Sequence, residues 1–475
     1  MNSTAPSTQP VTPPPPPEQD SLYAVRQKVY VRAVTGLFAN WRWALVWITQ
    51  ILFYGLPWLS WNGRQAVLLH LVERKFYIFG WVFWPQDVFF LAILLIISAY
   101  SLFFFTAIAG RLWCGYACPQ TVYTEIFMWV EQKIEGDRNK RMKLDKSPMS
   151  PRKFAIKAAK YGSWAAISIW TGFTFVSYFS PLSDLLRSVQ TLSFGPWELF
   201  WILFYGGFTY LFAGVMREQV CKYMCPYARF QSVMFDPDTL VITYDEARGE
   251  PRGARKKGVE PKSVSKGDCV DCGICVQVCP TGIDIRDGLQ YECIGCAACI
   301  DACDQVMDKM EYPRGLIRYS TENAIKKGWG TKEVVAHVFR PRTLIYGFVL
   351  VVLSLAFVWG LASREPLRVD VMRDRSSLAR EVEGGMIENV YELQIMNMTE
   401  QPRTFVFGAR GIDGIAIEGD KRLQVDAAGM RSVTLKVRAP YDPDKVGATE
   451  VFFEVYPEDK PSLKLSEKTT FLFPR

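Results

Sequence analysis

The chain has 475 residues, of which 49% are hydrophobic and 14% aromatic, and its formal charge at pH 7 is +7. The apolar residues gather into runs long enough to span a bilayer, with basic residues clustered beside them, which favours a membrane protein over a nucleic-acid-binding one. No G-x-G-x-x-G stretch follows a predicted strand and no G-x-x-x-x-G-K-[ST] stretch occurs, so nothing indicates a nicotinamide or nucleotide site.

Residues 1–20 are rich in Pro, Ser and Thr and include five consecutive prolines. They lack the apolar core of a signal peptide, so we expect a disordered tail.

Five segments of about 20 mostly apolar residues predict transmembrane helices. They lie at residues 41–61, 87–109, 158–179, 197–216 and 343–361. The connection between the second and third helices is rich in Lys and Arg, whereas the next connection holds Arg187 alone. Basic loops stay in the cytoplasm, so we expect a bacterial inner-membrane protein whose N-terminus and residues 221–342 are cytoplasmic and whose C-terminal part is periplasmic. The aromatic stretch from Asn62 to Gln86 suits an interfacial or re-entrant segment.

Two copies of a Cys-x-Tyr-x-Cys-Pro motif follow the second and fourth predicted helices. The four thiols are Cys114, Cys118, Cys221 and Cys225. Arg111 and Arg217 precede the two motifs, which indicates a duplicated helix pair that brings both motifs together at one membrane surface. Because proline disfavours helical geometry at the residue before it, we expect each helix to end or kink at the second cysteine.

Such a thiol set suits a soft ion, above all Cu(I), although dithiol chemistry and a third iron–sulfur cluster remain alternatives. Met224, and also Met216 and Met128, could add thioether ligands, but methionines near helix ends usually only pack. We expect Tyr116 and Tyr223 to pack against their neighbours.

Residues 262–313 contain C-x2-C-x2-C-x3-C twice, which is typical of a ferredoxin-like domain with two [4Fe–4S] clusters. Because the fourth cysteine of each run reaches the cluster of the other run, the predicted ligand sets are mixed. They are Cys269, Cys272, Cys275 and Cys303 for one cluster, and Cys293, Cys296, Cys299 and Cys279 for the other. Two four-cysteine zinc sites are the alternative. We expect no structural disulfides, and His70 and His337 are predicted on opposite sides of the membrane, which argues against a haem held by both.

Residues 366–475 contain short β-rich runs separated by turn residues, which predicts an immunoglobulin-like sandwich. It has no Cys, no His and no evident catalytic set, so we expect a docking or structural module. The predicted organisation is a multi-domain membrane protein in which an α-helical bundle carries a two-cluster ferredoxin-like insert and a C-terminal all-β sandwich. Its parts are a tail at 1–20, a membrane domain at 21–220, a cytoplasmic segment at 221–342, a last span at 343–361 and a periplasmic domain at 366–475.

At this point the chain resembles the FixG/CcoG/RdxA family of cytochrome c oxidase accessory proteins. The resemblance rests on the aromatic Arg-Lys-Phe and Phe-Trp-Pro-Gln-Asp segment, both C-x3-C-P motifs, the ferredoxin insert and the terminal sandwich. It implies a membrane-bound cupric reductase that supplies Cu(I) during assembly of a cbb3-type oxidase. The implied partners are the lipid bilayer, a copper exporter or chaperone and oxidase assembly factors, with no nucleic acid; a homodimer stays open.

The resemblance does not identify the electron donor, for which a cytosolic reductant and a quinol are the two alternatives. A quinol-oxidising conduit of the NapH or NosR type is the alternative function, because such proteins share the C-x3-C-P pairs. A cluster-bearing assembly scaffold or redox sensor without turnover is a further alternative.

Overall fold

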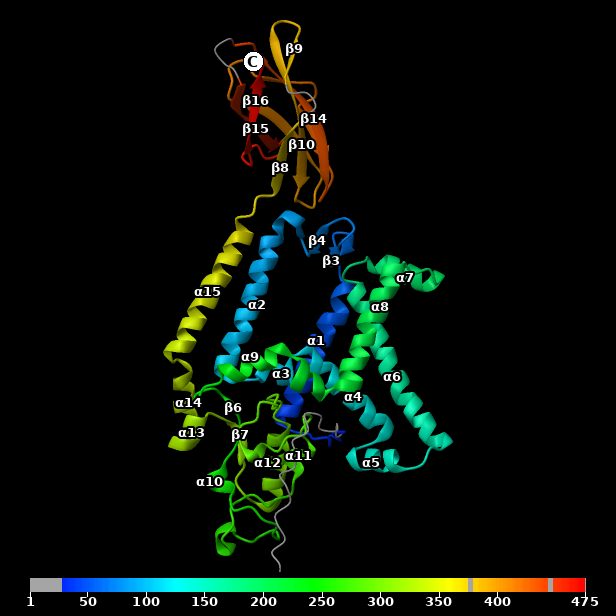
Figure 1. Ribbon diagram of the computed structural model, residues 1–475, viewed down its shortest axis with the longest axis vertical. Helices are drawn as coiled ribbons and strands as arrows, with labels where there is room; N and C mark the ends of the chain where they lie inside the picture. Colours follow the sequence, from blue (N-terminus) through cyan, green and yellow to red (C-terminus); the bar gives the residue numbers. More distant parts are fainter. Residues whose placement is uncertain (1–27, 375–378, 443–446, 475) are drawn as a thin grey trace, which may run out of the picture.

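The computed structural model describes residues 28–374, 379–442 and 447–474, so the predicted tail at 1–20 lies outside the described residues. Long helices occupy the middle of the molecule, the cysteine-rich insert lies at one end and the β-sandwich at the other (Figure 1). These long helices are α1 (Leu37–Gly55), α2 (Val88–Ala109), α6 (Pro151–Val176), α8 (Pro196–Thr209) and α15 (Pro341–Ala362). Each contains most of one predicted span.

Three helical segments are long and apolar enough to cross a membrane, namely Pro85–Ala109, Pro196–Met216 and Pro341–Ala362. The helices α1 and α6 are not among the segments that are long and apolar enough to cross a membrane. Arg42 lies inside α1 and Lys160 inside α6, and both side chains are buried in the protein. Five spans therefore remain a prediction, whereas three candidate spans are established.

The long helices form two pairs, α2 with α15 and α6 with α8 (Figure 1). Gly172 and Gly206 allow α6 and α8 to approach closely, since an added Cβ at Gly172 would lie 2.2 Å from the Ile202 carbonyl oxygen and one at Gly206 would lie 2.9 Å from the Ser168 oxygen. Small residues at such crossings are typical of helices that pack within a membrane.

Shorter helices surround the ends of the long ones. They are α3 (Leu112–Tyr116), α4 (Pro119–Glu135), α5 (Arg138–Lys146), α7 (Leu182–Thr191), α9 (Pro226–Met234), α13 (Glu322–Lys327) and α14 (Thr331–Val338). Beyond Thr209, α8 continues as a π-helical segment, η3 (Tyr210–Met216), and a second π-helical turn, η4 (Val220–Met224), follows. The sequence gives no signal for either π-helix.

The aromatic stretch before α2 is a small antiparallel sheet, which corrects the re-entrant form of our expectation, while an interfacial position stays a prediction. Strands β3 (Val67–His70), β4 (Lys75–Ile78) and β5 (Trp81–Phe83) pair in that order, next to the short pair β1 (Ser60–Trp61) and β2 (Arg64–Gln65). Leu68, Tyr77 and Val82 pack against Ala428 of the sandwich. The aromatic side chains thus belong to a folded connection between helices and sandwich.

The insert is built around α11 (Ile274–Gln277) and α12 (Ala298–Met310). The antiparallel strands β6 (Val241–Tyr244) and β7 (Ile317–Ser320) close it where the chain enters and leaves. Its remaining turns are α10 (Glu246–Gly249), η5 (Pro261–Val264) and η6 (Ile285–Asp287). Because the chain enters and leaves the insert through two paired strands, the insert is connected to the helical region at one place.

The C-terminal domain is a two-sheet sandwich, as the short β-rich runs of the sequence predict. One sheet has the order β12–β14–β10–β8 with β9 added to β10, and the other has the order β13–β11–β15–β16. Their bounds are β8 (Leu367–Arg373), β9 (Arg380–Val382), β10 (Met386–Asn397), β11 (Arg403–Arg410), β12 (Ala416–Glu418), β13 (Arg422–Val425), β14 (Met430–Pro440), β15 (Gly447–Pro457) and β16 (Leu465–Phe473). Tyr391, Phe405, Phe453 and Phe471 fill the core between the sheets.

Candidate metal and redox site

The eight cysteines of the insert surround two cavities. One cavity is lined by Cys269, Cys272, Cys275 and Cys303 together with Ile and Val side chains. The other is lined by Cys279, Cys293, Cys296 and Cys299, and Cys275 also borders it. These are the two mixed sets that the exchange of the fourth cysteine predicts. The cavities therefore fit two cubane clusters, while ligation by each thiol remains a prediction.

Among the residues that the structure describes, no three His, Cys, Asp or Glu side chains converge closely enough to hold a single metal ion. This is true of the insert cysteines and of the motif cysteines alike.

The chain also shapes the loops around the cavities for a cluster. Gly273 and Ala297 adopt left-handed backbone conformations, with φ of 63° and 58°, immediately before α11 and α12. Each turn places a cysteine, Cys275 or Cys299, in the first helical turn, where the backbone N–H groups have no partner within the helix. Such N–H groups stabilise the negative charge of a thiolate-bound cluster.

Both Cys-x-Tyr-x-Cys-Pro motifs form the same break between two helices. Cys118 and Cys225 are the N-cap residues of α4 and α9, in extended conformation with ψ of 127° and 112°, and the following proline opens the new helix. The predicted helix end at the second cysteine is confirmed. Four residues before the first cysteine, Gly110 and Arg217 share a backbone conformation, with φ of 54° and 44°. The duplication is therefore visible in the backbone as well as in the sequence.

The four thiols of these motifs lie within electrostatic range of one another. The pKa of Cys114 and that of Cys221 are both raised to about 12; burial is the largest cause, and the charges of other motif cysteines contribute to the rise. The Arg111 guanidinium opposes the rise at both thiols. Without a bound cation these thiols are neutral at pH 7, and a cation would favour their ionised, ligating form.

The first motif is docked directly onto the second cluster loop. A Cβ added at Gly115 would lie 2.8 Å from the Gly295 carbonyl oxygen and 2.9 Å from the Cys296 Cα atom. The Tyr319 hydroxyl donates to the Gly295 carbonyl at 2.6 Å and lies 3.3 Å from the Tyr116 hydroxyl. Backbone contact of this kind leaves no room for an intervening layer, so the motif thiols and the second cluster cavity are neighbours.

Arg111 is the charged residue common to both cysteine sets. Its side chain is buried, and its Nη2 donates to the Ala228 carbonyl at 2.7 Å. Its positive charge also lowers the pKa of Cys293, which burial raises to about 12. Cys114 in turn donates to the Gln231 side-chain oxygen at 3.4 Å. A single buried cation thus acts on the membrane-surface thiols and on the cluster cavity together.

Asp301 ties the insert to the start of α1. Its carboxylate is buried and accepts hydrogen bonds from the backbone N–H groups of Phe38, at 3.2 Å, and Ala39, at 2.7 Å. A carboxylate at this place satisfies the free donors of the helix and complements its dipole. The helical region and the insert therefore share a polar contact, next to the packing of Phe38 on Tyr319 of β7.

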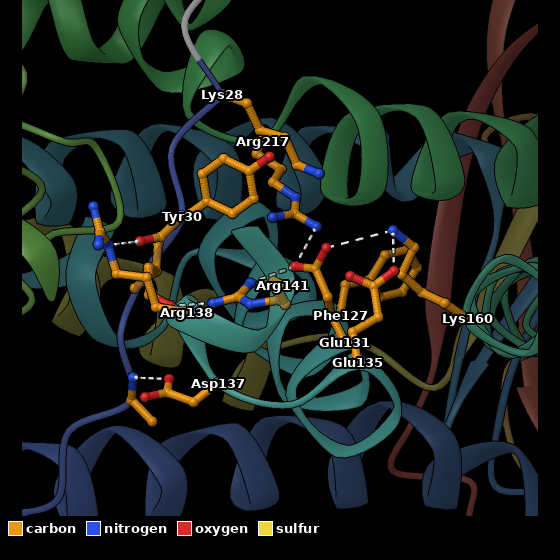
Figure 2. A network of polar contacts seen from close by, with 12 residues as sticks. Lys28, Tyr30, Phe127, Glu131, Glu135, Asp137, Arg138, Arg141, Lys160 and Arg217 are labelled. Atoms are coloured by element: carbon orange, nitrogen blue, oxygen red, sulfur yellow. Dashed lines mark hydrogen bonds and ion pairs between the residues drawn. The ribbon is translucent and has the colours of Figure 1, made fainter. Parts of the chain in front are cut away.

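A buried group of charged side chains lies beside the motif region (Figure 2). Glu131 of α4 accepts from Arg141 at 2.8 Å and from Arg217 at 2.9 Å, and Lys160 of α6 lies 2.9 Å from Glu135. Burial raises the pKa of Glu131, but Arg217, Arg141 and Lys160 outweigh it and hold that pKa below its ordinary value. This cluster joins α4, α5, α6 and the end of η3.

The predicted accessory residues fall in different places. Met128 lines a cavity together with Cys221, whereas Met224 is half exposed at the surface. Tyr116 is buried, as its predicted packing role requires, but Tyr223 is 68% exposed. The structure adds residues that sequence reasoning missed, namely Gly115, Asp301, Glu131, Lys160 and Gln231. Only Lys160, a charge in an apolar helix, carried a signal that could have identified it.

The fold and the cysteine geometry define a class, the membrane-associated iron–sulfur proteins with a ferredoxin domain. Family models agree: the model of a 4Fe-4S dicluster domain matches residues 216–322, and that of a 4Fe-4S binding domain matches residues 90–136. A third model, the immunoglobulin-like fold at the C-terminus of FixG, matches residues 357–474.

Relatives that match most of the chain identify the family more specifically than the single-domain models do. The chain is 39% identical to nitrogen fixation protein FixG of Rhizobium meliloti over 91% of its own length and 87% of that protein. It is 40% identical to RdxB of Cereibacter sphaeroides, over 88% of this chain and 90% of RdxB. It is 38% identical to RdxA of the same organism, over 90% of this chain and 92% of RdxA. The chain therefore belongs to the FixG/RdxA family, and it is an iron–sulfur redox protein.

Proposed function

We propose that this protein is an inner-membrane cupric reductase that converts Cu(II) to Cu(I) for assembly of a copper-containing cbb3-type oxidase. The observation that carries the proposal is the direct contact between Gly115 of the first motif and Gly295 of the second cluster loop. It joins an electron-carrying domain to a group of soft thiol ligands. Thiolates stabilise Cu(I) over Cu(II), so binding at the thiols favours reduction.

The topology in this proposal has five spans, with the insert in the cytoplasm and the sandwich in the periplasm. Supporting it are the basic connection between α4 and α6 and the opposite placement of insert and sandwich along the helices (Figure 1). Here α1 and α6 cross the membrane with their buried charges turned toward protein partners, as Arg42 and Lys160 are.

In the reaction, one electron and one Cu(II) ion give one Cu(I) ion. When bound, two [4Fe–4S] clusters would supply single electrons, held by Cys269, Cys272, Cys275 and Cys303 and by Cys279, Cys293, Cys296 and Cys299. Cys114, Cys118, Cys221 and Cys225 bind the copper substrate, and its positive charge compensates the cost of ionising buried thiols. Arg111 balances the remaining negative charge. Cu(I) then passes to an exporter or chaperone of the assembly machinery.

The test is anaerobic reduction of the purified protein, followed by Cu(II) and a Cu(I)-specific chelator. We expect Cys118→Ala and Cys225→Ala to abolish repeated Cu(I) formation while iron content stays unchanged. Tyr223→Phe is the matched control, because Tyr223 lies in the same motif but is exposed. Undiminished copper reduction in both cysteine variants would refute the proposal.

A second candidate has a specific observation in its favour. The 4Fe-4S binding domain model matches residues 90–136, where Cys114 and Cys118 are the available cysteines. In this case the four motif thiols hold a third cluster and the protein relays electrons to a partner. Iron analysis separates the two candidates, since two clusters need about eight irons per chain and three need about twelve.

A further inference from the structure

Two buried arginines of the helical region lie beside the second cluster cavity, the one bordered by Cys279, Cys293, Cys296 and Cys299. Arg42 of α1 lines a pocket that also contains Cys296, and its positive charge opposes the rise that burial causes in the pKa of that thiol. Arg111 precedes α3, and a Cβ added at Gly295 would lie 3.1 Å from its carbonyl oxygen and 3.6 Å from its Cβ atom. Each arginine is only 6% exposed. Neither belongs to the insert, so the docking of the insert on the helices brings both charges to this cavity.

The hydrogen bonds of these two guanidinium groups are incomplete within the part of the chain that the structure describes. Arg42 is paired with Glu125 at 3.7 Å, which is too long for a hydrogen bond, and its Nε atom has no partner there. Arg111 donates to the Ala228 carbonyl, and its Nε atom also has no partner among the described residues. Burying a cation without full compensation costs free energy unless a further negative group completes the site. A thiolate-bound cluster in the adjacent cavity is such a group.

The first cluster cavity, bordered by Cys269, Cys272, Cys275 and Cys303, has a different charge environment. Arg286 lines it and donates from Nε to Asp284 at 2.8 Å and from Nη1 to Asp271 at 2.5 Å. Two carboxylates therefore neutralise this one guanidinium group before any cluster is bound. Arg252 also acts on Asp284, but its side chain is 35% exposed, so solvent and salt screen its charge.

The carboxylates near the second cavity compensate its cations less completely. Glu125 and Asp301 both lie close enough to act on the charge of Arg42. The carboxylate of Asp301, however, is bound to the N-terminus of α1, whose free N–H groups and dipole offset its negative charge. Of the groups named for each cavity, the second has two buried cations for two carboxylates, one of them offset by a helix. The first has one cation for two carboxylates.

We propose that Arg42 and Arg111 raise the reduction potential of the cluster in the second cavity above that of the cluster in the first. Reduction adds one electron, and with it one negative charge, to a group whose potential depends on the charges around it. Two buried and incompletely paired cations stabilise this added charge more than the neutralised Arg286 does, because burial keeps solvent from screening them.

The second cavity is also the one whose loop touches the first Cys-x-Tyr-x-Cys-Pro motif, at Gly115 and Gly295. An electron given to the insert therefore rests preferentially next to the motif thiols. This inference rests on the two clusters of the proposed function, and it holds whichever acceptor binds at those thiols.

The test is an anaerobic redox titration of the full chain in lipid nanodiscs, with dithionite as the reductant, without copper, and followed by electron paramagnetic resonance. Cys272→Ser identifies the signal of the first cluster, because Cys272 borders the first cavity and not the second, and a change of ligand alters the signal of its own cluster. We expect the second cluster to have the higher potential. Arg42→Gln should lower that potential alone, by at least about tenfold in the equilibrium constant of reduction, which is about 59 mV for one electron.

Three further variants separate the effect of charge from a structural effect. Arg32→Gln is the matched control, because the Arg32 backbone also binds the insert while its side chain is exposed to solvent, so neither potential should change. Arg42→Lys keeps the positive charge and should stay close to the unmodified protein. Arg111→Gln should lower the same potential as Arg42→Gln does, and it replaces that variant in the test if Arg42→Gln does not fold.

A higher potential for the first cluster, or equal potentials in Arg42→Gln and Arg32→Gln, would overturn the role of the two arginines. A signal that disappears in Cys118→Ala belongs to the motif thiols and does not enter the comparison. Iron well below about eight per chain would refute the cluster assignment itself, and with it this inference. The expected potentials together with no reduction of Cu(II) would support the inference and refute the copper proposal alone.

Discussion

At the scale of single residues, glycine decides how the two redox parts meet. Gly115 and Gly295 are about 180 positions apart, yet their backbones touch, and each tolerates no side chain. The atoms that a new Cβ at Gly115 would meet are backbone atoms, which cannot rotate away. The contact therefore depends on the absence of two methyl groups.

We expect Gly115→Ala to separate the first motif from the second cluster loop. Overpacking of this kind costs about 1–3 kcal/mol, so the insert should shift before the protein unfolds. The measurement is the rate of Cu(I) formation after chemical reduction, together with iron content; the rate should fall and the iron should remain. Gly162→Ala on α6 is the control, because nothing lies within 4 Å of its added Cβ. Equal rates for the two variants would contradict the role given to Gly115.

At the scale of elements, residues 28–34 form a strap across the junction of insert and helices. Arg32 N–H donates to the Gln277 carbonyl at 2.8 Å on the insert side. On the helix side, Lys28 and Tyr30 bind Asp145 of α5 at 2.6 Å and 2.8 Å, and Arg138 donates to the Tyr30 carbonyl (Figure 2). The strap has no secondary structure, so the Arg32–Gln277 backbone hydrogen bond and these side-chain contacts hold it.

The strap should loosen in acid. Partial burial raises the pKa of Asp145, but hydrogen bonds from Lys157, Lys28 and Tyr30 outweigh this and hold the pKa well below its ordinary value. A lowered pKa stabilises the docked strap above the unfolded value of about 3.9, and this stabilisation is lost as pH falls below it. Hydrogen exchange of the strap amides, corrected for intrinsic rates, should therefore stay slow at pH 7 and 5 and rise below about pH 4. Asp145→Asn should remove this pH dependence; a strap equally protected at low pH would contradict the assignment.

The elements also show what a sequence can and cannot predict. The segments 87–109 and 343–361 nearly coincide with α2 and α15, because an unbroken apolar run leaves helix as the only way to satisfy the backbone in lipid. The ferredoxin loops follow from cysteine spacing alone. By contrast, the two- to four-residue strands between residues 60 and 83 are too short for alternation to be read.

The remaining differences involve contacts between distant segments. In the sequence, nothing distinguishes Asp301 from other polar residues between the cysteines. Its role becomes visible only in the fold, where the N-terminus of α1 lies against its carboxylate. Arg217 has a recognisable place before the second motif, but its partner Glu131 lies 86 residues away on another helix. Such pairs are set by the packing of elements, and no local pattern encodes them.

At the scale of the whole molecule, the sandwich is attached by more than the chain that leads to it. Glu400 binds Arg64, Asn62 and Trp61 of the strands that follow α1. Just beyond α15, Arg364 binds Asp87 at the start of α2. These contacts lie at the opposite end of the helices from the cysteines (Figure 1).

Glu400→Gln should therefore loosen the sandwich without affecting redox chemistry. Removing the charge breaks the ion pair with Arg64, and exposed or half-buried pairs contribute about 0.2–1 kcal/mol. Limited proteolysis of the connection between α15 and β8 should become faster, while iron content and Cu(I) formation stay unchanged. Glu458→Gln, which affects an exposed pair within the sandwich, is the control. Slower copper reduction in Glu400→Gln alone would show that the two ends communicate.

The cap that Asp301 provides for α1 has a consequence for how the protein matures. The ribosome synthesises Ala39, at the beginning of α1, 262 residues before it reaches the carboxylate that stabilises this end of the helix. Until the insert folds, the N–H groups of Phe38 and Ala39 lack this partner, and folding of so small a cysteine-lined domain depends on its iron. Iron supply would thus act as a checkpoint in biogenesis: chains made during iron starvation should expose the N-terminal end of α1 to proteases and be cleared before they can carry electrons.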